Sequence, residues 1–70
     1  MYLFDTITSA KDVAEQNAMY GLGLTNDQLQ EASKLEIHCS SFDDPGDDYN
    51  VYRFIREDGT TLTEIRKEGY

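Results

Sequence analysis

The chain has 70 residues, of which 39% are hydrophobic and 29% charged, and 14 acidic against 6 basic side chains give a formal net charge of -8. This length fits one domain spanning residues 1–70, since domains usually contain about 50 to 250 residues. The strongly acidic surface, with a pI ≈ 4.2, excludes direct binding to phosphate backbones and to anionic lipid surfaces.

The cysteine content and the hydropathy pattern indicate a compartment. One cysteine, Cys39, excludes an internal disulfide and a zinc site built from several cysteines. A chain without disulfides is typical of a reducing compartment, so we expect a cytoplasmic protein, in the host cytoplasm if the source is viral. No stretch of about 18 apolar residues occurs, and we therefore expect neither a membrane span nor a signal peptide.

The N-terminal part predicts a strand and a helix. Residues 1–7 alternate loosely between two faces, which predicts a short strand or an extended arm. Ser9 predicts a helix start, because its hydroxyl can accept the amide of Asp12, whose charge suits the positive end of the helix dipole. Gly21 predicts the end of this helix, since glycine adopts the positive φ that this position needs.

A second helix has the clearest start in the sequence. Thr25 and Gln28 have the spacing of a capping box, and Leu24 and Leu29 occupy the positions of a hydrophobic staple. We expect this helix to run to about Lys34, whose positive charge would lie at the negative end of the dipole.

A strand and an acidic loop follow. From Leu35 to Ser41 the pattern changes to a period of two, with Leu35, Ile37 and Cys39 on one face. The next residues favour a solvated loop, because Pro45 and Gly46 suit a turn and the four neighbouring carboxylates repel one another. These carboxylates belong to Asp43, Asp44, Asp47 and Asp48.

The C-terminal part predicts a hairpin. Residues 49–56 favour a strand, and Asp58-Gly59 favours a two-residue turn, so that residues 60–67 return antiparallel. In that register Glu57 pairs with Thr60. The further predicted pairs are Ile55 with Leu62, Phe54 with Thr63, Arg53 with Glu64, and Tyr52 with Ile65. A competing interpretation makes residues 61–68 a short helix.

These elements predict an α+β fold in which two short N-terminal helices pack on a three-stranded antiparallel meander. Residues 1–7 are a candidate fourth strand. The two helices resemble the helix-turn-helix of bacterial repressors, beginning with Lys11-Asp12-Val13-Ala14-Glu15. However, Lys34 is the only cation of the would-be recognition helix, and DNA would repel its acidic side chains.

Metal binding and catalysis find little support in the sequence. If Gly46 takes the glycine position of an EF-hand, Pro45 and Tyr52 fall where oxygen ligands are needed. His38 and Cys39 are adjacent on a strand, so they point to opposite faces and cannot act as a nucleophile and its base. We therefore expect no metal, no cofactor and no enzymatic activity, with His38 at the surface and Cys39 in the core.

What remains is a protein-binding function. We expect an inhibitor that presents carboxylates to a basic, nucleic-acid-binding surface of a larger protein. This profile is similar to that of phage-encoded inhibitors of host nucleases, restriction systems and CRISPR complexes, some of which mimic nucleic acid. The alternatives are a structural module that dimerises or docks through a sheet edge, or a small helix-turn-helix-like regulator.

Two features suggest where such a partner would bind. The chain concentrates carboxylates in three segments, and tyrosine is a residue type that anchors protein interfaces. The candidate partner-binding residues are Asp43, Asp44, Asp47, Asp48, Tyr49 and Tyr52 in and beside the acidic loop, Asp27 and Glu31 on the second helix, and Glu57 and Asp58 in the hairpin turn.

Overall fold

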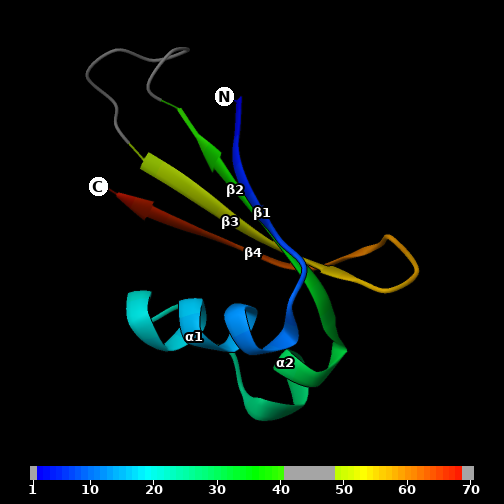
Figure 1. The fold of residues 1–70 in the computed structure, drawn as a ribbon. Helices are drawn as coiled ribbons and strands as arrows, with labels where there is room; N and C mark the ends of the chain where they lie inside the picture. The colour runs from blue at the N-terminus through cyan, green and yellow to red at the C-terminus, as the bar shows by residue number, and fades with distance from the viewer. Residues whose placement is uncertain (1, 41–48, 69–70) are drawn as a thin grey trace.

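The computed structural model describes residues 2–40 and 49–68 and shows an α+β fold with one sheet (Figure 1). The elements in chain order are β1 (Tyr2–Ile7), α1 (Ala10–Tyr20), α2 (Asn26–Glu31), β2 (Ala32–Cys39), β3 (Tyr49–Arg56) and β4 (Thr61–Glu68). All neighbouring strands are antiparallel, in the order β1-β2-β3-β4. The predicted class is confirmed, and residues 2–7 do form the fourth strand.

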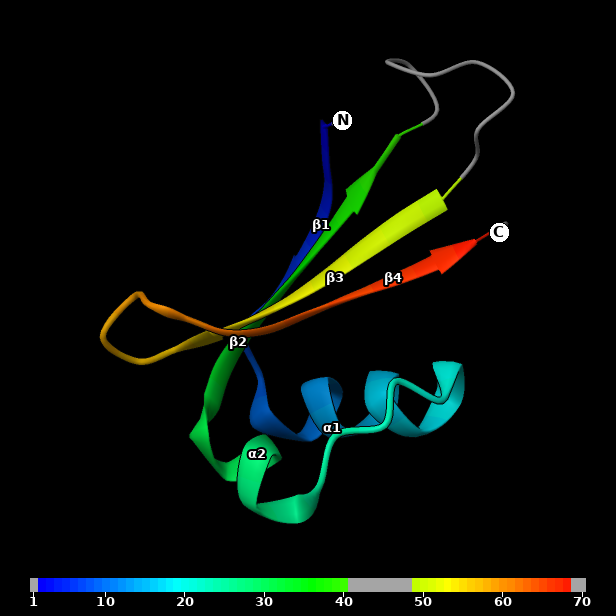
Figure 2. The same ribbon diagram turned by 180° about the vertical axis from the view of Figure 1, so that it is seen from behind.

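Both helices lie on the same side of the sheet, as the two opposite views show (Figures 1 and 2). We call this side of the sheet the helix face and the other side the open face. The core lies under the helices, where Leu35, Phe54 and Val13 are almost completely buried. Ile37 and Tyr52 extend this core along β2 and β3, and the predicted apolar face of β2 is confirmed.

Helix α1 begins and ends where predicted, but its first turn is not capped in the predicted way. Ser9 is extended and its carbonyl accepts the amide of Val13, yet its hydroxyl makes no capping bond, so the predicted bond to Asp12 is wrong. Ser9 is exposed, and water can satisfy the first amides of the helix. At the other end Gly21 has φ 60, which confirms the predicted left-handed stop.

Helix α2 begins as predicted and ends early. The hydroxyl of Thr25 accepts the amide of Gln28, and the side chain of Gln28 accepts the amide of Thr25, which completes the capping box. The helix ends at Glu31, so the predicted extension to Lys34 is wrong. Ala32 is instead buried in β2 and pairs with Arg56 of β3, because burial and strand pairing outweigh helix propensity.

The C-terminal segment is a strand, so the helical interpretation of residues 61–68 is wrong. Three predicted pairs are confirmed, namely Tyr52 with Ile65, Arg53 with Glu64 and Phe54 with Thr63. The fourth is wrong, because the register shifts and Ile55 faces Thr61 rather than Leu62.

The shift in register follows from the turn. The amide of Arg56 bonds to the carbonyl of Thr60, so the turn contains three residues and Glu57 does not pair with Thr60. Only Gly59 has positive φ there, whereas the expected two-residue turn needs positive φ at Asp58 as well. The predicted tight turn is therefore replaced by a three-residue turn with glycine in its last position.

Candidate binding surface

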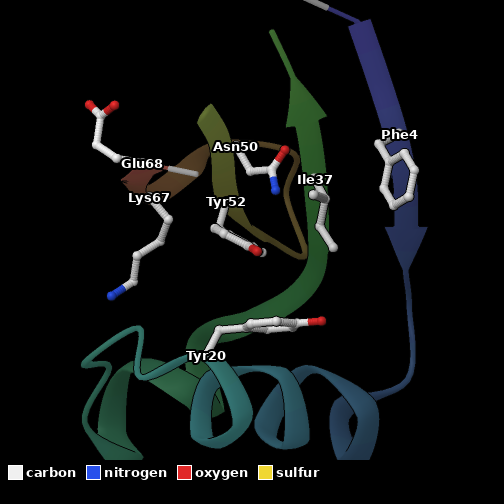
Figure 3. A pocket seen from close by; sticks show the side chains of 7 residues that line it. All are labelled: Phe4, Tyr20, Ile37, Asn50, Tyr52, Lys67 and Glu68. Atoms are coloured by element: carbon white, nitrogen blue, oxygen red, sulfur yellow. The ribbon is translucent and has the colours of Figure 1, made fainter. Parts of the chain in front are cut away.

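A groove with a volume of about 420 Å³ lies between the C-terminal end of α1 and the helix face of the sheet (Figure 3). We call it the aromatic groove, because three of its side chains are aromatic and its walls are mostly apolar. The residues that line it are Phe4, Tyr20, Ile37, Asn50, Tyr52, Lys67 and Glu68.

The two ends of the groove are positioned by local features of the backbone. Tyr20 is the last residue of α1, and its ring packs on the ring of Tyr52 with 5.7 Å between centroids. On β1 the register with β2 shifts between Leu3 and Asp5, so that Phe4 has no residue directly opposite on β2. The turn after α1 and the irregularity in β1 thus place two aromatic side chains at the groove.

The large hydrophobic side chains that are exposed among the described residues come from the same two places. They are Leu3 (49% exposed), Phe4 (66%), Met19 (67%) and Tyr20 (46%). Scattered exposed apolar residues are ordinary on a protein surface, but two of these four, Phe4 and Tyr20, line the same groove, whereas Leu3 and Met19 do not. A groove with two exposed aromatic side chains can hold an apolar side chain of a partner.

The polar groups of the groove are few. Burial raises the pKa of Tyr52 above its usual value, against the lowering effect of a hydrogen bond with Asn50, so the phenol is protonated at neutral pH. Figure 3 shows the Lys67 side chain directed toward the end of α1 and the Glu68 carboxylate directed away from it. The groove thus offers apolar contact with one cation at its side.

Carboxylates gather on the helices. Asp12 and Glu15 on α1 and Asp27 and Glu31 on α2 are all exposed. In the part of the chain that the structure describes, none of these four has an ion-pair partner. Lys11 is the single basic residue of the two helices, so the helical layer carries four acids and one base, a net charge of -3.

On the strands most charges are paired instead. Arg53 lies 3.1 Å from a carboxylate oxygen of Glu64 and 3.9 Å from one of Glu36 on the neighbouring strand. Lys34 also reaches Glu36, at 3.7 Å. The four strands carry four acids and five bases, so their formal charge is +1.

His38 and Cys39 differ from expectation in one respect. Cys39 is buried, as predicted, but the side chain of His38 is only 17% exposed and its Nε2 lies 3.2 Å from Glu36. The hydrogen bond with His38 is the main cause that lowers the pKa of Glu36, and Lys34 and Arg53 lower it further. His38 is therefore part of the ion-paired layer of the open face and not a free surface residue.

The predicted partner-binding residues that the structure describes do not form one surface. Tyr52 lines the aromatic groove on the helix face, whereas Tyr49 lies under the guanidinium of Arg66, 3.7 Å from ring centroid to Cζ, on the open face. The two tyrosines therefore lie on opposite faces of β3, because they are an odd number of residues apart on one strand.

The remaining predicted residues do not line the aromatic groove. Two lie in the turn between β3 and β4, two lie on α2, and four lie outside the described residues. Glu57 and Asp58 are exposed in the β3–β4 turn (Figure 1), where the Asp58 carboxylate accepts the amide and the hydroxyl of Thr60. Asp27 and Glu31 share α2. The four loop aspartates, Asp43, Asp44, Asp47 and Asp48, lie outside the described residues.

The sequence pattern does not predict the aromatic groove. The adjacent Leu3 and Phe4 point to opposite faces of an expected strand, so that one of them cannot share a single buried face. That was the available signal for an exposed apolar residue. The meeting of Tyr20 with Tyr52 has no local signal, since it depends on how α1 packs on the sheet.

Residues 2–40 and 49–68 contain no group of three or more His, Cys, Asp or Glu side chains placed to hold a metal ion. No helix among them is long and apolar enough to cross a membrane. Comparison of the chain with protein-family models, with curated proteins and with solved structures found no match.

Proposed function

We propose that this chain is a non-enzymatic binding protein that uses the acidic layer of α1 and α2 to occupy a basic, nucleic-acid-binding surface of a larger cytoplasmic protein, and thereby inhibits it. The observation that carries this proposal is the unequal distribution of charge. Among the described residues the helices hold four exposed carboxylates without ion-pair partners, while three of the five strand cations are in ion pairs.

Unpaired carboxylates suit a steering role. A carboxylate already bonded to an arginine within the chain has part of its charge compensated, whereas Asp12, Glu15, Asp27 and Glu31 have no ion-pair partner among the described residues. Complementary charge mainly increases the rate of association, and its effect falls with ionic strength. The acidic layer is therefore expected to determine how fast the partner binds.

The aromatic groove supplies a means of holding the partner. Interfaces gain most of their affinity from a few desolvated aromatic anchors and not from charges at the rim. Phe4 and Tyr20 are exposed at the groove next to the end of α1, within the same side of the molecule as the acidic layer. A partner that is steered by the helices could thus insert an apolar side chain between sheet and helix.

The test starts from capture of partners by the immobilised chain, followed by purification of each captured protein. Displacement of a fluorescent DNA or RNA duplex from that protein is then measured by anisotropy as the chain is added. We expect displacement, with an affinity for the chain that falls about tenfold or more as salt rises through the physiological range. A partner that does not bind nucleic acid, or whose affinity is independent of salt, would contradict the proposal.

Two variants with the same change in charge locate the contact. One neutralises the helices (D12N, E15Q, D27N, E31Q), and the other neutralises the predicted loop (D43N, D44N, D47N, D48N). We expect the helix variant to slow association about tenfold or more at low salt while circular dichroism shows an intact fold. If only the loop variant slows association, the acidic contact belongs to the loop.

A further inference from the structure

The two edges of the sheet differ in their ability to accept another strand. On β1 the pairing register is interrupted between Leu3 and Asp5. On β4, residues 63–68 each face a residue of β3 in unbroken register, and no described strand pairs with the outer edge of β4. A regular edge strand presents unpaired backbone groups that can add a further strand.

The charges of β4 restrict how a second copy could pair with it. Two identical antiparallel strands related by a two-fold axis perpendicular to the sheet must have one residue opposite its own copy. An axis at Glu64, Arg66 or Lys67 would place like charges opposite each other, which is destabilising. Charged edge residues normally protect a strand from pairing, and in these registers they would do so here.

One register has the opposite property. When Ile65 lies on the axis, it faces Ile65 of the copy, and Glu64 faces Arg66 of the copy twice. Both charged residues are on the open face, and their side chains are about half exposed (47% for Glu64, 50% for Arg66), so that they are accessible from the edge. This arrangement combines an apolar pair with two opposite-charge pairs.

Contacts within the chain also hold these side chains in place. Glu64 accepts a bond from Arg53 at 3.1 Å. Arg66 lies 3.1 Å from Glu68 and stacks over the ring of Tyr49. Arg66 and Glu64 thus stand ordered on the open face before a second copy arrives, which reduces the ordering cost of association.

We propose that β4 pairs with β4 of a second copy in the register centred on Ile65, joining two four-stranded sheets into one. The helices of both copies would lie on the same side of the joined sheet, because a two-fold axis perpendicular to the sheet preserves its faces. This assembly uses none of the four helical carboxylates and is independent of the proposed inhibition.

Sedimentation velocity with charge-reversed chains tests the register. The wild-type chain is expected to dimerise at about 150 mM salt, where the repulsion between two acidic chains is screened. E64K alone and R66E alone should be monomeric, because each creates two like-charge pairs. Their equimolar mixture should form a heterodimer at least about tenfold tighter than either variant alone, since both cross-strand pairs are then of opposite charge.

A matched control and a second measurement complete the test. K67E makes the same change of charge as R66E on the same strand, but Lys67 faces Thr63 of the copy in this register and has no ion-pair partner among the described residues, so K67E should still dimerise. Amide exchange of the wild-type β4 should slow as its concentration rises, which requires no variant to fold. A wild-type chain that stays monomeric, a dimer of E64K alone, or a mixture of folded variants that stays monomeric would overturn the proposal.

Discussion

The helix face and the open face of the sheet bury apolar residues in different ways. On the helix face Leu35 and Phe54 are covered by α1 and α2 and have no exposed surface. On the open face Val51 and Ile55 are almost as well buried, although no helix covers them (Figures 1 and 2). The difference shows that charged side chains can replace a layer of secondary structure as a cover.

The cover of the open face consists of long ion-paired side chains. Lys34 faces Ile55 across the strands, Arg66 faces Val51, and Arg53 lies between Glu36 and Glu64. The aliphatic stems of lysine and arginine can shield apolar surface while their charged ends stay in water. Three of the six basic residues of the chain are occupied in this way, and in the part of the chain that the structure describes no cation pairs with the helical carboxylates.

The largest expected effect contrasts one core residue of each face. Leu35→Ala should lower the free energy of unfolding by about 4 kcal/mol, whereas Ile55→Ala, which removes the same number of carbon atoms, should lower it by about 2 kcal/mol. The reason is that the flexible cover of the open face can collapse into the space left by Ile55, while the helices hold the cavity at Leu35 open. Urea denaturation of both variants measures the difference. Equal losses would show that the two faces pack alike.

A smaller effect tests the cover of the helix face. No residue of α2 is fully buried, so this helix depends on its capping box and on the partly buried Leu24 and Leu29 beside it. Thr25→Ala should lower the free energy of unfolding by about 1 kcal/mol through loss of the cap. Thr25→Ser keeps the hydroxyl and should have an unchanged denaturation midpoint. If Thr25→Ala also leaves the midpoint unchanged, the cap does not stabilise α2 on the helix face of the sheet.

Features that depend on neighbours in the sequence could be predicted, whereas features that depend on contacts with another strand could not. The capping box of Thr25 and Gln28 and the stop at Gly21 involve neighbours in sequence, and both are confirmed. The end of α2 at Glu31 was missed, because it is set by the pairing of Ala32 with Arg56 on another strand. Local propensity does not reveal such a competition between helix and sheet.

The same distinction holds for the candidate site. The pairs of Tyr52 with Ile65 and of Arg53 with Glu64 could be predicted from the sequence. The shift in register at Ile55 could not, because it depends on the length of the turn. The exposed carboxylates of α2 could be named from the sequence. That they have no ion pair among the described residues could not be predicted from the sequence, because the ion pairs of Arg53 become visible only when β2, β3 and β4 lie side by side.

The ion pairs of the open face can be tested individually. Arg53→Met keeps an unbranched apolar stem and removes the charge that Glu36 and Glu64 share. We expect a loss of about 0.5 to 1 kcal/mol in the free energy of unfolding, because the side chain is partly exposed and solvent weakens the pairs. Lys11→Met on α1, where no ion pair is found among the described residues, should lose close to nothing. A loss as large for Lys11→Met would mean that net charge and not pairing is responsible.

The smallest effect concerns pH. In the folded chain the pKa of Glu36 is lowered, first by the hydrogen bond with His38 and then by the charges of Lys34, His38 and Arg53. A lowered pKa contributes stability that is present above the unfolded-state value, about 4.5, and is lost as the pH falls through the folded-state value. The wild-type chain should therefore lose more stability than Glu36→Gln when the pH is lowered from about 6 to about 3.

Urea denaturation across this pH range measures that difference, and Glu31→Gln on α2 is the matched control. Glu31 has no ion pair in the described part of the chain, so its variant should keep the acid sensitivity of the wild type. If Glu36→Gln and Glu31→Gln follow the wild type equally, the ion-paired layer does not set the response to acid, and the contrast between paired strands and unpaired helices would have no effect on stability.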